Sequence, residues 1–566
     1  MTADTITVSE VLELLDGPFA ELASSVSDGG YVLWLGSGIS RGRVIGLDGV
    51  IAKLLEYLRG RVTPAVDCRF RTALSEILDI AKLPGPDRAS IDLASPVDAW
   101  PVFNALIDGL WNNYAEMLSV DVSGEAPDFL LWDALDFPNT FATQDPDVEH
   151  LAVAILILEG VTDKVATPNW DGLIEGALEE FGVDKDRIAI TVTGKDLRNQ
   201  AGALATFYKF HGCALRAIEN EAGYRSLLVA RSVQIGGWMH DDTFRVVRDQ
   251  LKAVAQVKRS LMVGLSAQDK NIQDIFTSIG AQSGWDWSES PSAVVFSGTK
   301  LTQNQKDILA LTYTKAWTGS KSDICDASLI PAYGKSLLPA LVLSVLTRKL
   351  KALASLADAP NFNDADRARL DEGLITLRNR VAEAGATDLL ALMRTLGAVV
   401  ARVRAQIQDG DSPAGALPYF PISNGPAAQL VHDPAIRSTG QREAAAALAV
   451  VGSVVQTGDW TAATENPLVV TSGAVRISAG LGSAKIFFAA NDHIIGELLK
   501  AGAFSETDRD AVIVCAGEAT PRQHRSPSAS YRGLLGEAKF VSFGPMMTSA
   551  ANADALIDGF RKEVGL

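Results

Sequence analysis

The sequence contains few cysteines, and none of them are closely paired along the chain. There are four, scattered without a C-x-x-C motif: Cys68, Cys213, Cys325 and Cys515. A cysteine-based zinc site needs such pairs, so the sequence offers no tetrahedral zinc site and predicts no bound metal. The same scattered cysteines fit a reducing compartment.

Long apolar runs are absent as well. The longest, such as residues 151–158, fall short of the about 20 apolar residues that a helix needs to span a bilayer. Residues 1–15 carry Asp4, Glu10 and Glu13 and have no basic start before an apolar core, which is unlike a signal peptide. We therefore expect a cytoplasmic protein without membrane contact.

Basic residues are fewer than acidic ones: the sequence has 51 Lys and Arg residues and 68 Asp and Glu residues, which gives a net charge of −17. A protein that wraps nucleic acid needs a basic face to neutralise phosphates, so this balance argues against such a function. The exception is a basic loop from Arg522 to Arg532. This loop either contacts phosphates or an acidic partner, or is simply a solvated loop.

The length of 566 residues allows about three domains, and the apolar and charged fractions, 47% and 21%, are typical of globular proteins. We predict an α/β domain at 1–315, a helical connector at 316–415 and a small C-terminal α/β domain at 416–566. The proline-rich segment 412–426 marks the second boundary.

In the first domain, short apolar runs alternate with helical patterns, which is typical of parallel strands joined by crossover helices. We predict a doubly wound, Rossmann-like parallel sheet with a helical insertion between its first two strands. The expected strands are residues 31–35, 161–167, 188–192, 206–210, 260–263 and 292–296.

The C-terminal domain shows the same kinds of pattern on a smaller scale. Its expected strands are residues 468–471, 475–478, 485–489, 511–515 and 539–543, and a helix near 553–564 follows them.

Two motifs of small and polar residues follow the first two strands of the predicted sheet. Gly36-Ser37-Gly38 forms a strand-to-helix turn that either binds a nucleotide phosphate through backbone N–H groups or is an ordinary tight turn. Arg41 replaces the third glycine of the G-x-G-x-x-G fingerprint, which weakens a simple dehydrogenase interpretation. Asn169 and Asp171 follow the strand at 161–167; Asp171 either caps the next helix or contacts a ligand, and for Asn169 we favour the ligand.

Two further motifs follow later strands. His211-Gly212 comes directly after the strand at 206–210, and an imidazole there can serve as a general base near neutral pH. We interpret most other histidines, including His150, as surface or packing residues. Gly264-Leu265-Ser266 with Asp269 follows the strand at 260–263, either to let an adenosine pass close to the backbone or as a strand-ending turn.

Together these motifs, GSGIS, TPNWDGLIE, KFHG and GLSAQD, resemble the sirtuin-fold NAD-binding domain in order and placement, over about residues 25–300. Unlike sirtuin deacylases, the chain lacks the two C-x-x-C pairs of a zinc ribbon and the proline-containing substrate loop. It is more similar to the bacterial anti-phage group of sirtuin-like proteins, which hydrolyse NAD+ to nicotinamide and ADP-ribose and so starve an infected cell.

The resemblance implies a role for each motif, with NAD as the substrate. Gly36, Ser37, Gly38 and Ser40 are expected to cradle the diphosphate and adjoining ribose, and Gly264, Ser266 and Asp269 to border the adenosine. Asn169 is expected to hold the nicotinamide ribose and orient a water molecule, Asp171 to support the pocket, and His211 to assist as base.

The resemblance also implies regulation of such a toxic activity by other parts of the assembly. Proteins of this group work with a sensor, and we expect a homo-oligomer or a partner such as a HerA-like hexameric ATPase or a short Argonaute. The alternatives are a non-enzymatic sensor that binds NAD or ADP-ribose and, less favoured, a deacylase without zinc.

Overall fold

The parallel sheet of the first domain is the centre of the molecule, seen here in a computed structural model that describes residues 2–199, 202–280, 285–520 and 537–566. Within these ranges seven parallel strands pair in the order β3-β4-β2-β1-β5-β6-β7. Their bounds are β1 Tyr31–Leu35, β2 Lys164–Thr167, β3 Ile188–Thr191, β4 Ala205–Lys209, β5 Arg259–Val263, β6 Val294–Ser297 and β7 Leu329–Ile330. The predicted doubly wound sheet is confirmed, and six of these strands overlap the predicted ones.

Both faces of the sheet are covered, which is why its strands are apolar throughout. Leu33 and Leu35 of β1 face a core shared with α1 (Val8–Asp16), α2 (Ala20–Ser27), α9 (Val148–Leu158), α10 (Leu173–Glu180) and α18 (Gly334–Ser355). Val32 and Trp34 face the opposite core, shared with α14 (Arg245–Val257), α15 (Lys270–Gly280), α16 (Gln303–Thr312) and α17 (Trp317–Ala327). Successive side chains of a strand point to opposite faces, so each core takes alternate residues.

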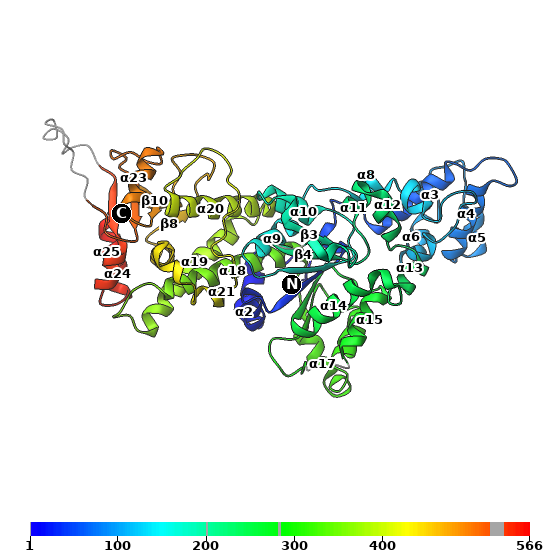
Figure 1. Ribbon diagram of the computed structural model, residues 1–566, viewed down its shortest axis with the longest axis horizontal. Helices are drawn as coiled ribbons and strands as arrows, with labels where there is room; N and C mark the ends of the chain where they lie inside the picture. The colour runs from blue at the N-terminus through cyan, green and yellow to red at the C-terminus, as the bar shows by residue number, and fades with distance from the viewer. Residues whose placement is uncertain (1, 200–201, 281–284, 521–536) are drawn as a thin grey trace.

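A helical lobe with its own core projects from one end of the molecule (Figure 1). The predicted insertion supplies α3 (Leu47–Arg59), α4 (Arg69–Ile80), α5 (Gly85–Ala89), α6 (Phe103–Trp111), α7 (Tyr114–Met117) and α8 (Phe137–Phe141). A second insertion after β4 supplies α11 (Ala214–Glu219), α12 (Glu221–Tyr224) and α13 (Ser232–Gly237). Ala214 and Ala217 are buried in the same core as Leu54 and Phe137, so the two insertions form one lobe.

The range of the predicted helical connector, 316–415, contains α17, α18, α19 (Asp364–Ala384) and α20 (Leu389–Asp409). Of these, α18, α19 and α20 lie between the sheet and the C-terminal end of the molecule (Figure 1). The chain then continues through α21 (Ala427–Leu430) and α22 (Gln441–Gln456). β7 also lies within the range 316–415, and α18 packs directly on α1 and α9 of the first domain.

The C-terminal unit contains, in the part of the chain described, a mixed sheet in the order β12-β11-β10-β9-β8. Its elements are β8 Thr461–Ala463, β9 Val475–Ala479, β10 Gly482–Ala489, α23 Asp492–Lys500, β11 Ala511–Cys515, β12 Lys539–Ser542, α24 Phe543–Ser549 and α25 Ala553–Val564. Four of the predicted strands and the closing helix are confirmed. The basic loop from Arg522 to Arg532 lies outside the described residues.

The predicted strand at 468–471 is wrong, because these residues form turns. The buried guanidinium of Arg402 accounts for the difference: it donates to the carbonyls of Val469 (2.5 Å) and Val470 (2.9 Å) and to that of Pro467 (2.6 Å). Carbonyls bound in this way are unavailable to a strand ladder, and the edge position is taken by β8 instead.

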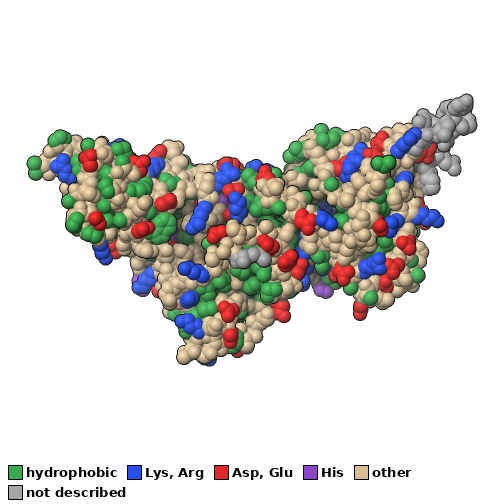
Figure 2. Space-filling view, turned by 180° about the vertical axis from the view of Figure 1, so that it is seen from behind, with side chains coloured by type: hydrophobic (Ala, Val, Ile, Leu, Met, Phe, Trp, Pro, Cys, Tyr) green, Lys and Arg blue, Asp and Glu red, His purple; other side chains and the backbone are tan. Residues whose placement is uncertain are grey.

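Acidic and basic side chains are interspersed over the face of the molecule drawn in Figure 2. No helix within the described ranges is both long and apolar enough to cross a membrane. Among the same residues, no three His, Cys, Asp or Glu side chains stand close enough together to hold a metal ion.

Candidate active site at the carboxyl ends of the strands

The two glycines after β1 allow the turns that follow β1 and β5 to touch. Gly36 N–H donates to the carbonyl of Val263 (3.0 Å), and Gly38 N–H donates to that of Gly264 (3.0 Å). A Cβ atom at Gly36 or Gly38 would lie within 2.4 or 2.6 Å of Gly264 atoms, a distance that only glycine avoids. The backbone at Gly36 and Gly38 therefore approaches the turn after β5 closely. The exposed residue of the Gly36-Ser37-Gly38 motif is Ser37.

This pair of turns lies at the point where the strand order reverses, with β2 on one side of β1 and β5 on the other. In open α/β sheets ligands bind at such a switch point, outside the carboxyl ends of the strands. The short helical turn Ser37–Ser40 continues from β1 at this edge and places Ser40 beneath it.

Ser40 is the centre of a buried polar network. Its hydroxyl donates to Asp171 Oδ2 (3.0 Å), and it accepts from Asn169 Nδ2 (3.4 Å). Asn169 and Asp171 both lie in the loop between β2 and α10, as their position after a strand predicted. Asn169 is only half-buried, so it is the member of the network nearest to solvent.

His150 completes this network, although its sequence context indicated only a packing or surface role. It is fully buried at the start of α9, and its Nδ1 accepts the backbone N–H of Asp147 (3.1 Å). The neutral ring therefore carries its proton on Nε2, which faces Ser40 Oγ at 3.4 Å. Burial lowers the pKa of His150 to about 4, so the ring is neutral at physiological pH.

Asp171 is held in place from several directions. Its Oδ1 accepts the N–H of Leu173 (3.3 Å) in the first turn of α10, so the capping and site interpretations of this residue are compatible. Its backbone carbonyl accepts Lys209 Nζ, which also pairs with Glu175 Oε1 at 2.5 Å. Burial raises the pKa of the Asp171 carboxyl above its usual value, while Lys209 and Ser40 act against the rise.

His211 lies beside this network but bonds to a different partner. Asn271 at the start of α15 places Nδ2 at 2.6 Å from His211 Nε2, and the His211 carbonyl accepts the indole N–H of Trp170 (2.8 Å). An amide nitrogen only donates, so Nε2 accepts and the neutral ring carries its proton on Nδ1. Burial lowers the pKa of His211 below its usual range.

Asn271 itself is a site residue that the sequence analysis missed. It is fully buried, and its Oδ1 has no hydrogen-bond partner among the described residues. Buried polar atoms are nearly always paired, so an unpaired oxygen next to a histidine calls for a functional explanation. Its position two residues after Asp269 is the one sequence signal that pointed to this helix start.

The turn after β5 has an unusual backbone. Gly264 has φ +66°, and Ala267 has φ +57°, a left-handed conformation that is costly for a residue with a Cβ. Ser266 between them is exposed, whereas the Asp269 carboxylate accepts the hydroxyl of Tyr114 (2.7 Å) from the helical lobe. Strained backbone of this kind is typical of functional sites.

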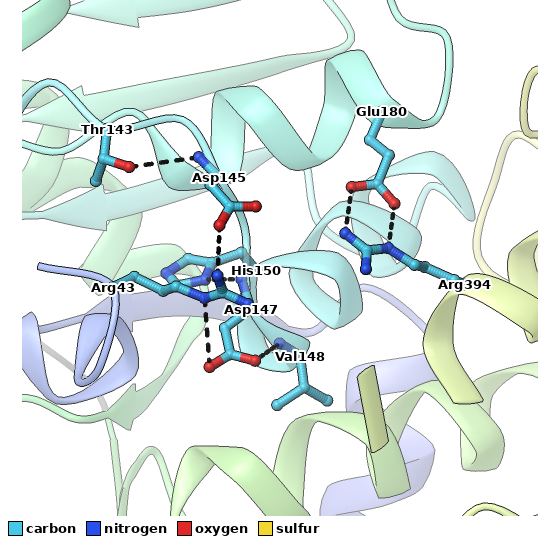
Figure 3. A network of polar contacts seen from close by, with 8 residues as sticks. All are labelled: Arg43, Thr143, Asp145, Asp147, Val148, His150, Glu180 and Arg394. Carbon is cyan, nitrogen blue, oxygen red and sulfur yellow. Dashed lines mark hydrogen bonds and ion pairs between the residues drawn. The ribbon is translucent and has the colours of Figure 1, made fainter. Parts of the chain in front are cut away.

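The loop after Ser40 is fixed by a separate set of charges, shown in Figure 3. Arg43 pairs with Asp145, and its Nε lies 3.7 Å from Asp147 Oδ2. Asp147 is the residue whose backbone N–H donates to His150. In the same view, Arg394 of α20 makes two hydrogen bonds of 2.7 and 3.1 Å to Glu180 of α10. The connector is thus tied to the helix that follows the Asn169 loop.

The structure therefore brings the motifs GSGIS, TPNWDGLIE and KFHG together at one edge of the sheet. The fourth motif, GLSAQD, packs against GSGIS. Ser40, Asn169 and Asp171 form one hydrogen-bonded group; Gly264 packs on Gly36 and Gly38; and Trp170 connects this group to His211. Ser37 and Ser266 are exposed beside them.

Comparison with known proteins identifies a family that matches part of this chain. Residues 163–315 match the family model of the SIR2-like domain, a range that includes Asn169, Asp171, His211, Gly264 and Asn271. No curated protein matches the chain. SIR2-like domains imply NAD binding and are often NAD-dependent enzymes, so the match supports a sirtuin-like family and an NAD-related function for this chain.

Proposed function

We propose that this protein is an NAD+ glycohydrolase that cleaves NAD+ to nicotinamide and ADP-ribose. The observation that carries the proposal is the buried Ser40–Asn169–Asp171 network at the switch point of a SIR2-like sheet, with His211 beside it. NAD+ is a substrate here, and the proposal requires no metal.

The reaction breaks the bond between nicotinamide and C1′ of its ribose, and the bonding electron pair leaves with nicotinamide. A water oxygen then bonds to C1′, and one proton is released. The centre at C1′ is electron-poor in the transition state, so a site gains most by stabilising that charge and by positioning the water.

Asn169 is the residue we assign to positioning the water and the nicotinamide ribose. Its Nδ2 is directed at Ser40, which leaves its amide oxygen as an acceptor at the half-buried edge of the network. Ser40 in turn donates its hydroxyl to Asp171 Oδ2, so the Asp171 carboxyl group lies behind the amide. In its ionised form this carboxyl group favours positive charge in front of it, and does so more strongly in a low-dielectric position than in water.

His211 is the residue we assign to accepting the released proton, with Asn271 as its positioning partner. Nε2 of the neutral ring is occupied by Asn271 Nδ2, and a protonated Nε2 would need an acceptor there instead. A half-turn of the Asn271 amide presents its unpaired Oδ1 to that proton. The pair can therefore match either charge state of the imidazole.

The remaining predicted residues are assigned to the rest of the nucleotide. Ser37 and Ser40, with the turn formed by Gly36 and Gly38, would border the diphosphate and adjoining ribose. Gly264, Ser266 and Asp269 would border the adenosine; Ser37 and Ser266 have the exposed hydroxyls suited to these contacts.

A second candidate, a non-enzymatic sensor of NAD or ADP-ribose, is favoured by one observation. His211 is 4% exposed and its Nε2 already has a partner, which is typical of a structural histidine. The sensor and the hydrolase differ in product formation and not in binding.

The experiment is incubation of the purified full chain with NAD+, alone and with candidate partners, and separation of nicotinamide and ADP-ribose by chromatography. We expect Asn169→Ala and His211→Ala to lower turnover by orders of magnitude, and the exposed controls Asn112→Ala and His240→Ala to leave it unchanged. Tight NAD binding without product under every condition would contradict the hydrolase and favour the sensor.

We further propose that the activity serves anti-phage defence and is released by oligomerisation or by a sensor partner, such as a HerA-like ATPase or a short Argonaute. Hydrolysis of a shared cofactor harms the cell that hosts it, so it requires control. Cellular NAD+ measured during phage infection tests this setting: it should fall with the wild-type chain and hold with Asn169→Ala.

A further inference from the structure

The connector contains a groove that is separate from the site above and borders the main hydrophobic core. It has a volume of about 480 Å³ and lies among α18, α19 and α20, the helices between the sheet and the C-terminal unit in Figure 1. Its half-buried apolar side chains come from all three helices: Leu350, Leu377, Val381, Leu396, Val400 and Val403.

The spacing of these residues shows that the groove is lined by continuous stripes. Leu377 and Val381 are four residues apart on α19, and Leu396, Val400 and Val403 recur at four and three residues on α20, so each set occupies one helix face. α19 packs chiefly on α22, whose Ala444, Ala445 and Leu448 also line the groove, and α20 packs on α9 and β10. Apolar area is therefore left uncovered between them.

One charged lining residue has buried nitrogens without a partner in the part of the chain that the structure describes. Nε and Nη1 of Arg404 are buried without a hydrogen-bond acceptor among the described residues, and its guanidinium lies over the Phe420 ring at 4.5 Å. Burial lowers the pKa of Arg404 to about 10. Leaving buried cationic nitrogens unpaired is unfavourable, so this position is suited to an anion.

The other charged residues near the groove already have partners. The lining carboxylate of Asp388, at the start of α20, accepts the backbone N–H of Ala391 (2.9 Å). Arg378 binds Asp16 and Arg380 binds Glu383, although both arginines line the same groove. The buried Glu159 near Arg404 is held by Lys349 Nζ (2.6 Å) and by the Tyr419 hydroxyl (2.5 Å). Arg404 is thus the lining cation that is left to bind something else.

The position of Arg404 relative to the apolar stripe specifies the ligand. Arg404 follows Val400 by four residues on the same helix face, so the cation stands at one end of the stripe. From Leu392, which also lines the groove, to Arg404 the helix rises by about 18 Å, at about 1.5 Å per residue. A long apolar chain with an anionic end matches this arrangement.

We propose that this groove binds a single free fatty acid, with the alkyl chain along the α19 and α20 stripes and the carboxylate on Arg404. The volume falls in the range of about 300–1,000 Å³ that is common for small-molecule sites with mainly apolar lining and few polar groups. A recessed cation below the surface suits one chain entering the groove better than a flat membrane surface.

The test is calorimetric titration of the full chain with sodium decanoate and, separately, with decan-1-ol, which has the same chain but no charge. Decanoate should bind one per chain and at least tenfold more tightly than decan-1-ol. Arg404→Gln should weaken decanoate at least tenfold and leave decan-1-ol within twofold. Arg380→Gln is the matched control and should change neither, because its guanidinium already has a partner.

Val400→Trp fills the groove and should weaken both ligands at least tenfold, with a circular dichroism spectrum unchanged from wild type. If this variant fails to fold, the contrast between the two ligands in Arg404→Gln still decides. Absence of saturable binding, or equal binding of decanoate and decan-1-ol, would overturn the proposal. So would a dimer, or binding to phosphatidylglycerol vesicles, that Val400→Trp abolishes, since either assigns the groove to a different occupant.

Discussion

Replacement of Lys209 by Met tests how much the buried ion pair between Lys209 and Glu175 stabilises the region of the candidate site. Lys209 and Glu175 form an ion pair of 2.5 Å, and their residues are only 1% and 2% exposed. Met fills a similar volume but leaves the Glu175 carboxylate without its cation in the interior. Breaking a buried pair in this way costs about 3–5 kcal/mol, because one charge stays desolvated and uncompensated.

The assay is thermal unfolding, together with hydrogen exchange at the amides of β2 and β4. For a unit of 150–250 residues each kcal/mol corresponds to about 2–4 °C, so the midpoint should fall by about 6–20 °C. The double variant Lys209→Met with Glu175→Leu should recover most of this loss, since a well-packed apolar pair often replaces a buried ion pair at little cost.

The control is Lys185→Met, which removes an exposed pair with Glu179 at 3.6 Å and should cost no more than about 1 kcal/mol. A loss below about 1 kcal/mol in Lys209→Met, or a double variant as unstable as the single one, would refute the reasoning. Lys209 also bonds the Asp171 carbonyl, so the stable double variant should still cleave NAD+ more slowly than wild type.

Three further predictions concern neighbouring residues. Ser40→Ala leaves Asp171 Oδ2 without its donor and should cost about 1–3 kcal/mol in unfolding free energy and at least tenfold in NAD+ turnover; unchanged values in urea unfolding and product assays would contradict the network. Burial raises the pKa of Glu149 from 4.5 to about 7, with Asp147 adding to the rise and Lys335 opposing it, so the stabilising proton uptake of the folded state is lost as pH rises through about 7. Glu149→Gln should therefore unfold at a higher temperature than wild type at pH 8 and at nearly the same one at pH 5; equal midpoints at pH 8 would count against this. Ala267→Gly relieves a residue at φ +57° and should raise the urea-unfolding free energy by about 0.5–1 kcal/mol, whereas a loss would show that the Ala267 methyl group contributes more than the strain costs.

Most strands of the first domain could be predicted from the sequence, because parallel strands are buried on both faces. Tyr31–Leu35 is buried at every position, and so it reads as an uninterrupted apolar run whatever surrounds it. The same argument fails at β7, which has two residues, and at β8, whose residues are exposed or half-buried. Residues 468–471 have a composition typical of a strand, but Arg402, which is distant in sequence, donates hydrogen bonds to the carbonyls of Val469 and Val470.

Convergence of the strand-end motifs was also predictable, since the carboxyl ends of parallel strands share one edge of the sheet. This is why Ser40, Asn169 and Asp171, separated by up to 131 positions, were expected together and are found hydrogen-bonded. The local pattern around each residue was enough to place it at the end of its strand.

The partners of these residues were decided only by the tertiary structure. His150 contacts Ser40 across 110 positions, and Asn271 contacts His211 across 60, in each case from a helix whose local sequence shows no sign of the other residue. Hydrogen bonds and ion pairs depend on distances of a few tenths of an ångström, which arise from how α9 and α15 pack on the sheet. The sequence by itself determined which residues stand at the sheet edge; packing determined which atoms they meet there.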